Sequence, residues 1–214
     1  MAKYKNGING PVSGKVGTVV GASWRGIDYV RNVSDTSKVK WSVAQVNQRV
    51  LFALVMNWIR PLLSIINVGY QLVKDGKTPM NAAMSYHLNE AVRGEAPAYE
   101  IVLSKAVFSR GELIGAIIRK LHSMDSDLCY ISWDSAGASF FCNADDQVVF
   151  ILFDAMKSRF VSYVNAARRA DGEVMLQLPA GFSCDELHCY MHLVRADGAM
   201  VSTTVYAGLI LPEL

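Results

Sequence analysis

The spacing of apolar and polar residues changes twice along the chain and divides it into three stretches. Up to residue 31, β-branched residues alternate with glycines, which is typical of short strands and tight turns. Between residues 42 and 94, apolar residues recur at every third or fourth position, a spacing that predicts helices. After Pro97, short apolar runs separated by turn residues predict β structure.

The first stretch is predicted to form a hairpin of two strands, 15–20 and 27–31, around a segment 21–26 with a glycine at each end. A two-stranded hairpin is marginal in water by itself, so this one needs another surface to pack against. The polar segment 32–40 is predicted to link the hairpin to the helices. We therefore expect the first stretch to serve docking or assembly rather than catalysis.

The middle stretch is predicted to contain two helical segments. Ser42 is the expected N-cap of the first, and Pro61 is expected to kink or restart it before it ends at about Gly69. Its apolar stripe is formed by Val43, Val46, Val50, Leu54 and Trp58. The second segment is expected to begin at Thr78, with proline at its first helical position, and to stop at Gly94.

The apolar run 50–70 is about as long as a membrane-spanning helix, but its composition argues against that role. Arg60 and Pro61 lie at its middle, with Asn57 and Asn67 on either side. A central arginine alone costs about 2.5–3.5 kcal/mol on insertion scales. We predict a buried helix or helical hairpin and no membrane insertion.

The last stretch predicts an antiparallel β-sandwich of the immunoglobulin or fibronectin type III kind, with Trp133 in its core. Two Asp-Gly turns, at Asp171 and Asp197, favour hairpins. The candidate strands are 100–108, 128–133, 139–142, 147–153, 160–166, 173–178, 188–194 and 201–211. The predicted fold class is thus α+β, with an N-terminal hairpin and helical region in 1–97 and a sandwich domain in 98–214.

Composition and charge refine this picture. The chain is 51% apolar and 19% charged, so a core can form and global disorder is excluded. Residues 1–60 carry nine Lys and Arg against two Asp, a formal charge of +7, whereas residues 61–214 carry twelve against seventeen acids, or −5. The basic part could contact nucleic acid, a membrane or the acidic part of a neighbouring copy, and the spaced basic residues favour the last.

The start of the chain and its cysteines indicate the compartment. Lys3 and Lys5 are followed by polar residues, glycines and a proline where a signal peptide needs an apolar region, so we expect synthesis in the cytoplasm without a signal peptide. The four cysteines, Cys129, Cys142, Cys184 and Cys189, are then expected to be reduced, partly buried thiols.

No motif in the sequence indicates an enzyme. Gly14-Lys15 lacks the upstream glycine and the following Ser or Thr of a P-loop. Cys184, His188 and His192 form the one ligand-rich cluster, and His188 and His192 would share a strand face. A zinc site there would need ligands from elsewhere, so we predict no metal, no cofactor and no catalytic residues.

The first stretch also contains a small set of aromatic and basic residues that could stack on bases or form a protein interface. The regular glycines favour the interface, because backbones must approach closely there. The predicted assembly-interface residues are Lys15, Val19, Trp24, Arg25, Tyr29 and Arg31.

Three segments resemble an uncharacterised protein family of Bacteroidota, a domain of unknown function. They are GPVSGKVGTVVGASWRGIDYVR (10–31), TPMNAAMSYHLNEAVRGEAPAYEI (78–101) and ADGAMVSTTVYAG (196–208). The motifs that carry the resemblance are SGKVGxVVGxxWxGxxYxR and ADGxxVSxxxYxG. The resemblance implies no activity and no catalytic residues.

We expect a non-enzymatic structural protein that forms homo-oligomers through its N-terminal hairpin. A phage or phage-like particle component, with other particle proteins as partners, fits a protein of this kind by analogy of fold. The alternatives are a binding module whose sandwich loops hold a glycan or protein ligand, and a nucleic-acid-binding accessory protein. A metal-dependent enzyme at Cys184, His188 and His192 ranks last.

Overall fold

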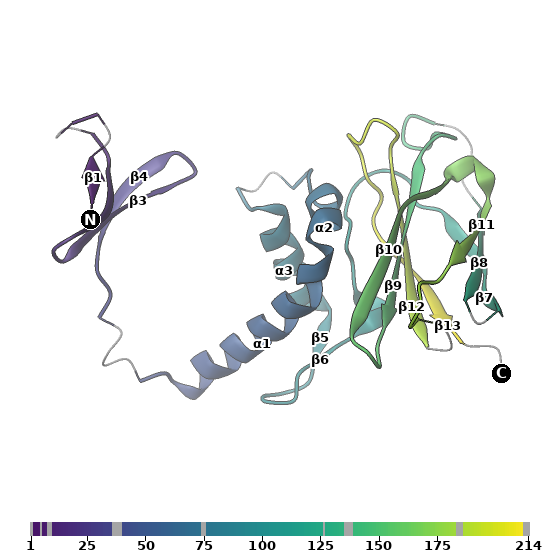
Figure 1. Cartoon of the computed structure of the whole chain (residues 1–214), viewed down its shortest axis with the longest axis horizontal. Coiled ribbons are helices and arrows are strands. Elements are labelled where there is room, and N and C mark those ends of the chain that lie inside the picture. Colours follow the sequence, from purple (N-terminus) through teal and green to yellow (C-terminus); the bar gives the residue numbers. More distant parts are fainter. Residues whose placement is uncertain are drawn as a thin grey trace. The chain divides into compact units, whose positions relative to one another are not determined.

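The computed structural model describes residues 2–4, 6–7, 10–35, 40–73, 76–125, 127–134, 139–182 and 186–211 (Figure 1). The chain forms two compact units, Met1–Val46 and Asn47–Leu214. The predicted boundary after residue 97 falls inside the second unit. The helical region and the strands that follow it share a buried core there, described below.

The first unit is an antiparallel sheet of four strands in the order β1 to β4. The strands are β1 (Lys3–Tyr4), β2 (Val12–Val16), β3 (Val19–Trp24) and β4 (Ile27–Asn32). The predicted strand 15–20 is wrong, because a turn at Gly17 and Thr18 divides it. Gly17 has a φ of +58°, which glycine adopts without steric cost. The predicted separator 21–26 holds most of β3, whereas the prediction for 27–31 is confirmed.

The helices of the middle stretch follow the predicted pattern, except that the second segment ends at Glu90 and not at Gly94, because Val92–Arg93 form a strand. They are α1 (Val43–Ile59), the 3₁₀ helix η1 (Arg60–Leu62), α2 (Leu63–Gly69) and α3 (Pro79–Glu90). Ser42 caps α1 as expected: its hydroxyl accepts the N–H of Gln45 at 3.3 Å, and its own N–H donates to the Gln45 side chain at 3.0 Å. The Thr78 hydroxyl likewise caps α3 by accepting the N–H of Asn81 at 3.2 Å.

The helical run Val43–Gly69 is long and apolar enough to cross a membrane by length and composition, with a mean hydropathy of 1.6. A core helix of a water-soluble protein meets the same criterion. Its second half contributes Val55, Ile59 and Ile66 to a buried cluster, whereas Val43 and Phe52 are exposed. The absence of membrane insertion stays a prediction.

Two antiparallel sheets make up most of the second unit, so the coarse α+β assignment is confirmed. One sheet has the order β10-β9-β12-β13, and the other has the order β11-β8-β7. Their strands are β7 (Ile117–Asp125), β8 (Leu128–Asp134), β9 (Gln147–Asp154), β10 (Arg159–Arg168), β11 (Glu173–Gln177), β12 (Leu187–Val194) and β13 (Val205–Ile210). A short pair, β5 (Val92–Arg93) and β6 (Glu100–Ile101), lies between α3 and these sheets in the sequence.

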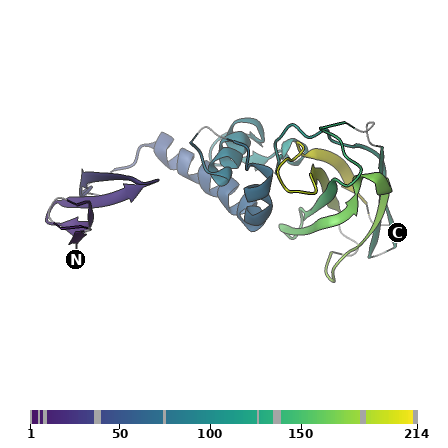
Figure 2. The ribbon, with the colours of Figure 1, turned by 90° about the horizontal axis from the view of Figure 1, so that it is seen from above.

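In the four-stranded sheet of the second unit, the central strands β9 and β12 are buried on both faces. Trp133 and Phe150 belong to the cluster shared by the two sheets, as predicted for Trp133. Ile151 and Phe153, which alternate with the residues of that cluster along β9, join Tyr190 and the helices in a second cluster. Figure 2 shows the helices on one side of these strands. None of the residues in the buried clusters comes from the first unit.

The predicted strands of the last stretch are partly confirmed. Strands β8 to β12 lie where five of them were expected. The predicted strand 100–108 is wrong beyond β6, because residues Leu103–Lys105 form the 3₁₀ helix η2. The predicted strand 139–142 forms only an isolated bridge between Ser139 and Cys142. The prediction 201–211 is confirmed for β13. Strand β7 was not predicted.

Candidate functional site

The first unit carries large apolar side chains without a core to bury them. Among its described residues only Gly21 is buried. The exposed apolar side chains on its strands are Tyr4, Val16, Trp24, Ile27, Tyr29 and Val30. A sheet that leaves such residues in water is typical of a surface that another molecule covers.

Four of the six predicted interface residues lie on one face of this sheet, which we call the aromatic–basic face. Lys15 pairs with Val20, which pairs with Arg31, so all three side chains point to the same side. The pairs of Ala22 with Tyr29 and of Trp24 with Ile27 continue this face by the two-residue strand period. Trp24 is 60% exposed and Tyr29 is 44% exposed.

Arg25 extends the aromatic–basic face at the turn between β3 and β4. Its guanidinium carbon lies 5.3 Å from the centroid of the Trp24 ring, a cation–π distance. Arg25 and Gly26 both have positive φ angles, of 52° and 81°, as the tightest hairpin turns require. The turn therefore presents an aromatic ring and a cation together.

Val19 lies on the opposite face, which we call the valine face. A cavity of about 210 Å³ there is lined by Tyr4, Val12, Val16, Val19, Gly21 and Val30. A Cβ on Gly21 would meet the backbone oxygen of Val12, so these strands approach too closely for any other residue. Sequence reasoning missed the other members of this face, although Val12, Val16 and Val30 are β-branched residues that favour strands.

The outer edge of β4 has no strand partner among the described residues, since β4 is the last strand of its sheet. The Val33 N–H donates to the Thr18 oxygen at 2.8 Å, and inward and outward bonds alternate along an antiparallel strand. The N–H of Val30 therefore points to the open edge. A gap of about 340 Å³ separates residues 28–30 from residues 10–12.

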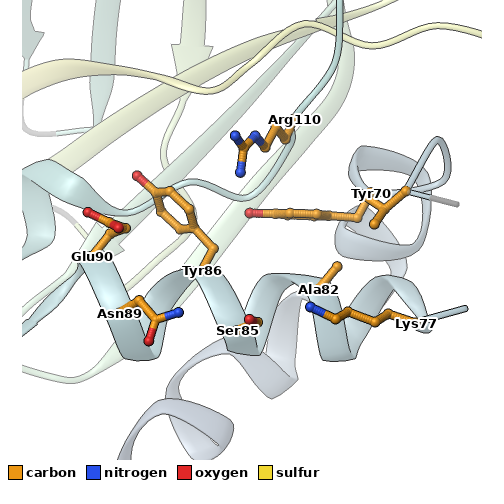
Figure 3. Close-up of a pocket in the computed structure, with 9 residues that line it drawn as sticks. Tyr70, Lys77, Ala82, Ser85, Tyr86, Asn89, Glu90 and Arg110 are labelled. Carbon is orange, nitrogen blue, oxygen red and sulfur yellow. The ribbon is translucent and has the colours of Figure 1, made fainter. Parts of the chain in front are cut away.

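A polar pocket of about 230 Å³ lies in the second unit beside α3 (Figure 3). The Tyr70 hydroxyl donates to the Val107 oxygen at 2.8 Å, and Tyr86 donates to the Lys105 oxygen at 3.3 Å. Figure 3 shows the Arg110 guanidinium directed toward the space between these phenols. Burial raises the pKa of Tyr70, and the neighbouring Tyr86 raises it further. Burial thus holds the Tyr70 phenol as a neutral hydrogen-bond donor, which suits structure rather than acid–base chemistry.

The candidate metal ligands do not come together in the described part of the chain. His188 and His192 share a face of β12 as predicted, but the His188 Nδ1 lies 2.8 Å from the Tyr206 hydroxyl. Cys184 lies outside the described residues. No three His, Cys, Asp or Glu side chains gather within the described ranges to hold a metal ion.

Comparison with known proteins adds the family but no activity. Residues 11–208 match a family of unknown function, DUF6266. The expectation of an uncharacterised family is confirmed, while its Bacteroidota origin and its motifs stay predictions. No curated protein matches the chain.

Proposed function

The chain belongs to the family of unknown function DUF6266, and we propose that it is a non-enzymatic structural protein that self-associates through its first unit. The observation that carries the proposal is the set of exposed apolar side chains on a sheet that has only Gly21 buried. Covering such side chains stabilises an assembly by about 25 cal/mol for each Å² removed from water.

The open edge of β4 supports a specific mode of association. An extended segment of a neighbouring copy would add to β4 by backbone hydrogen bonds and cover Val30 and Ile27, each 63% exposed. Charge supports a contact between copies as well. The first unit carries seven Lys and Arg against two Asp, whereas the second carries fourteen against seventeen acids.

Two finer statements belong to the same proposal. The two sheets of the second unit share one core, which supports an immunoglobulin- or fibronectin-like sandwich as its architecture. A phage or phage-like particle, with its other proteins as partners, is the setting that fits a self-associating protein of this size made in the cytoplasm.

Substitution of Val30 tests the edge directly. Val30→Pro removes the outward N–H and leaves the β3–β4 hydrogen bonds in place. The matched control Val30→Thr keeps both the N–H and the β-branched shape. We expect the wild type and Val30→Thr to form oligomers by light scattering, and Val30→Pro to be a folded monomer. Oligomers of unchanged mass in Val30→Pro would exclude this mode.

A nucleic-acid-binding role is the second candidate, and one observation favours it. Lys15 and Arg31 lie on the same face as Trp24 and Tyr29, a combination that can hold a backbone and stack bases. This role would also use Arg25, Lys38, Lys40 and Arg49, of which Lys38 lies outside the described residues. Binding of a single-stranded oligonucleotide that falls steeply with salt and is lost in Trp24→Ala would support this role over assembly.

The sandwich-loop alternative has less support. It predicts exposed aromatic residues gathered on loops of the second unit, and there Phe140 and Phe141 are exposed side by side, with Arg195 over the Phe140 ring. The exposed aromatic residues of the first unit are Tyr4, Trp24, Tyr29 and Trp41. Their position favours the first unit as the binding surface.

A further inference from the structure

A second cavity, of about 350 Å³, lies within the second unit between α2 and the four-stranded sheet. Val149 on β9 and His192 on β12 are direct cross-strand partners and form its floor. Ile65 and Val68 on α2 form the opposite wall, and Val164 on β10 stands at one side. We call it the His192 cavity.

Two features of the fold lie beside this cavity. The ladder between β9 and β10 is irregular between Tyr163 and Ala167, and Asn165 within it has a positive φ of 57°. At the end of α2, the Gln71 side chain donates to the Gly198 oxygen at 2.6 Å.

His192 is a buried polar residue in the lining of this cavity whose ring is not fully hydrogen-bonded. Its side chain is 1% exposed, and its Nδ1 has no hydrogen-bond partner among the described residues. Burial lowers its pKa from 6.5 to about 4, so the imidazole is neutral at physiological pH. A buried polar atom without a partner is destabilising, and a hydrogen bond from a suitable ligand would remove this cost.

We propose that the His192 cavity binds a small, uncharged, mainly apolar molecule whose single hydroxyl group hydrogen-bonds to the His192 Nδ1. A hydroxyl both donates and accepts, so it complements either tautomer of the imidazole. The described lining contains no Lys, Arg, Asp or Glu, which excludes a charged ligand on electrostatic grounds. The lining also contains Ser64, Gln147 and Asn165, but its remaining side chains are those of valines and an isoleucine, which favour a mainly apolar ligand.

Matched pairs of probes test this site on the full-length protein. In p-cresol and p-xylene a hydroxyl replaces a methyl group at nearly constant shape, and cyclohexanol and methylcyclohexane form a second such pair. By ligand-observed NMR we expect the alcohol of a pair to bind about tenfold more tightly than its hydrocarbon. Binding should also shift the nitrogen resonance of the His192 Nδ1.

Two variants and one control decide the location. Val164→Trp places a large ring at the exposed mouth and should abolish binding, whereas Met156→Trp, at a turn residue 83% exposed, should leave it unchanged. His192→Phe should remove the preference for the alcohol. The proposal is overturned if neither alcohol binds up to its solubility limit, if the His192 resonance does not move, or if Val164→Trp binds as the wild type does.

Discussion

Thr204 illustrates how single buried hydroxyls hold this fold together. Its hydroxyl accepts the backbone N–H groups of Phe108 and Ser109 at 3.1 and 2.8 Å, and its own N–H donates to the Ser109 oxygen. The chain at 106–110 passes beside the helices and here meets the start of β13. One side chain thus joins segments that lie 95 residues apart in the sequence.

We predict that Thr204→Val lowers the free energy of unfolding by about 1–3 kcal/mol, because it keeps the shape and leaves two buried N–H groups without an acceptor. Thr203→Val is the matched control, since the Thr203 hydroxyl is exposed and donates to Gly111 at 3.3 Å. Urea unfolding measures both. Equal midpoints for the two variants would contradict the role of Thr204.

His192 gives a prediction for the dependence of stability on pH. Its pKa in the folded chain is about 4 and its ordinary value is 6.5, so the unfolded state binds more protons between these values. The free energy of unfolding should therefore fall by about 1.4 kcal/mol for each pH unit below 6.5, until the folded imidazole protonates. His192→Phe removes this contribution, while His87, whose pKa burial also lowers, stays in both proteins. A stability difference between them that stays constant with pH would exclude this explanation.

Local residue chemistry was the most predictable part of the molecule. Ser42 and Thr78 were expected as caps from their place before periodic apolar residues, and each makes the expected hydrogen bond. The buried pair of Asp146 and Arg169, with 3.0 Å between carboxylate oxygen and guanidinium nitrogen, was not predicted. Asp146 and Arg169 lie in separate connections between strands, and these come together only when the sheets fold.

At the scale of elements, α2 packs against the chain at 108–110 through a glycine. A Cβ on Gly69 would meet the backbone oxygen of Phe108 and the Cα of Ser109, and the Gly69 oxygen accepts the N–H of Arg110 at 2.9 Å. The contact therefore sets the distance between helix and chain. The backbone atoms that a Cβ at position 69 would meet cannot move aside as the end of a flexible side chain can.

We predict that Gly69→Ala destabilises the protein by about 1–3 kcal/mol, although alanine favours helices over glycine. Gly115→Ala is the control, because a Cβ there meets only the Val205 side chain, at 3.8 Å. Thermal unfolding followed by circular dichroism compares the two. A higher melting temperature for Gly69→Ala would show that helix propensity outweighs the contact.

Elements with a clear apolar pattern were predicted well, whereas the wrong predictions arose at turns and in strands of mixed composition. The run from Val148 to Phe153 is apolar at every position, which signals a strand buried on both faces. Asp171-Gly172 was read as a hairpin turn, yet it connects β10 to β11 in the other sheet. Strand β7 was missed because its sequence, IIRKLHSMD, mixes charges with apolar residues.

At the scale of the whole molecule, the two units differ in how they are stabilised. Every buried cluster lies in the second unit, whereas the strands of the first expose their apolar side chains. The sequence indicated a segment in need of a surface, and five of the six proposed interface residues lie on or beside the aromatic–basic face. The His192 cavity was beyond sequence reasoning, because its walls come from α2, β9, β10 and β12.

The mass of the full-length chain in solution, measured beside a variant lacking residues 1–31, tests the central claim most directly. The truncation removes no residue of a buried cluster, so the variant should fold. We predict closed or extended oligomers for the full chain by light scattering and negative-stain imaging, and a folded monomer for the variant. Two folded monomers, or oligomers that persist without residues 1–31, would contradict self-association through the first unit.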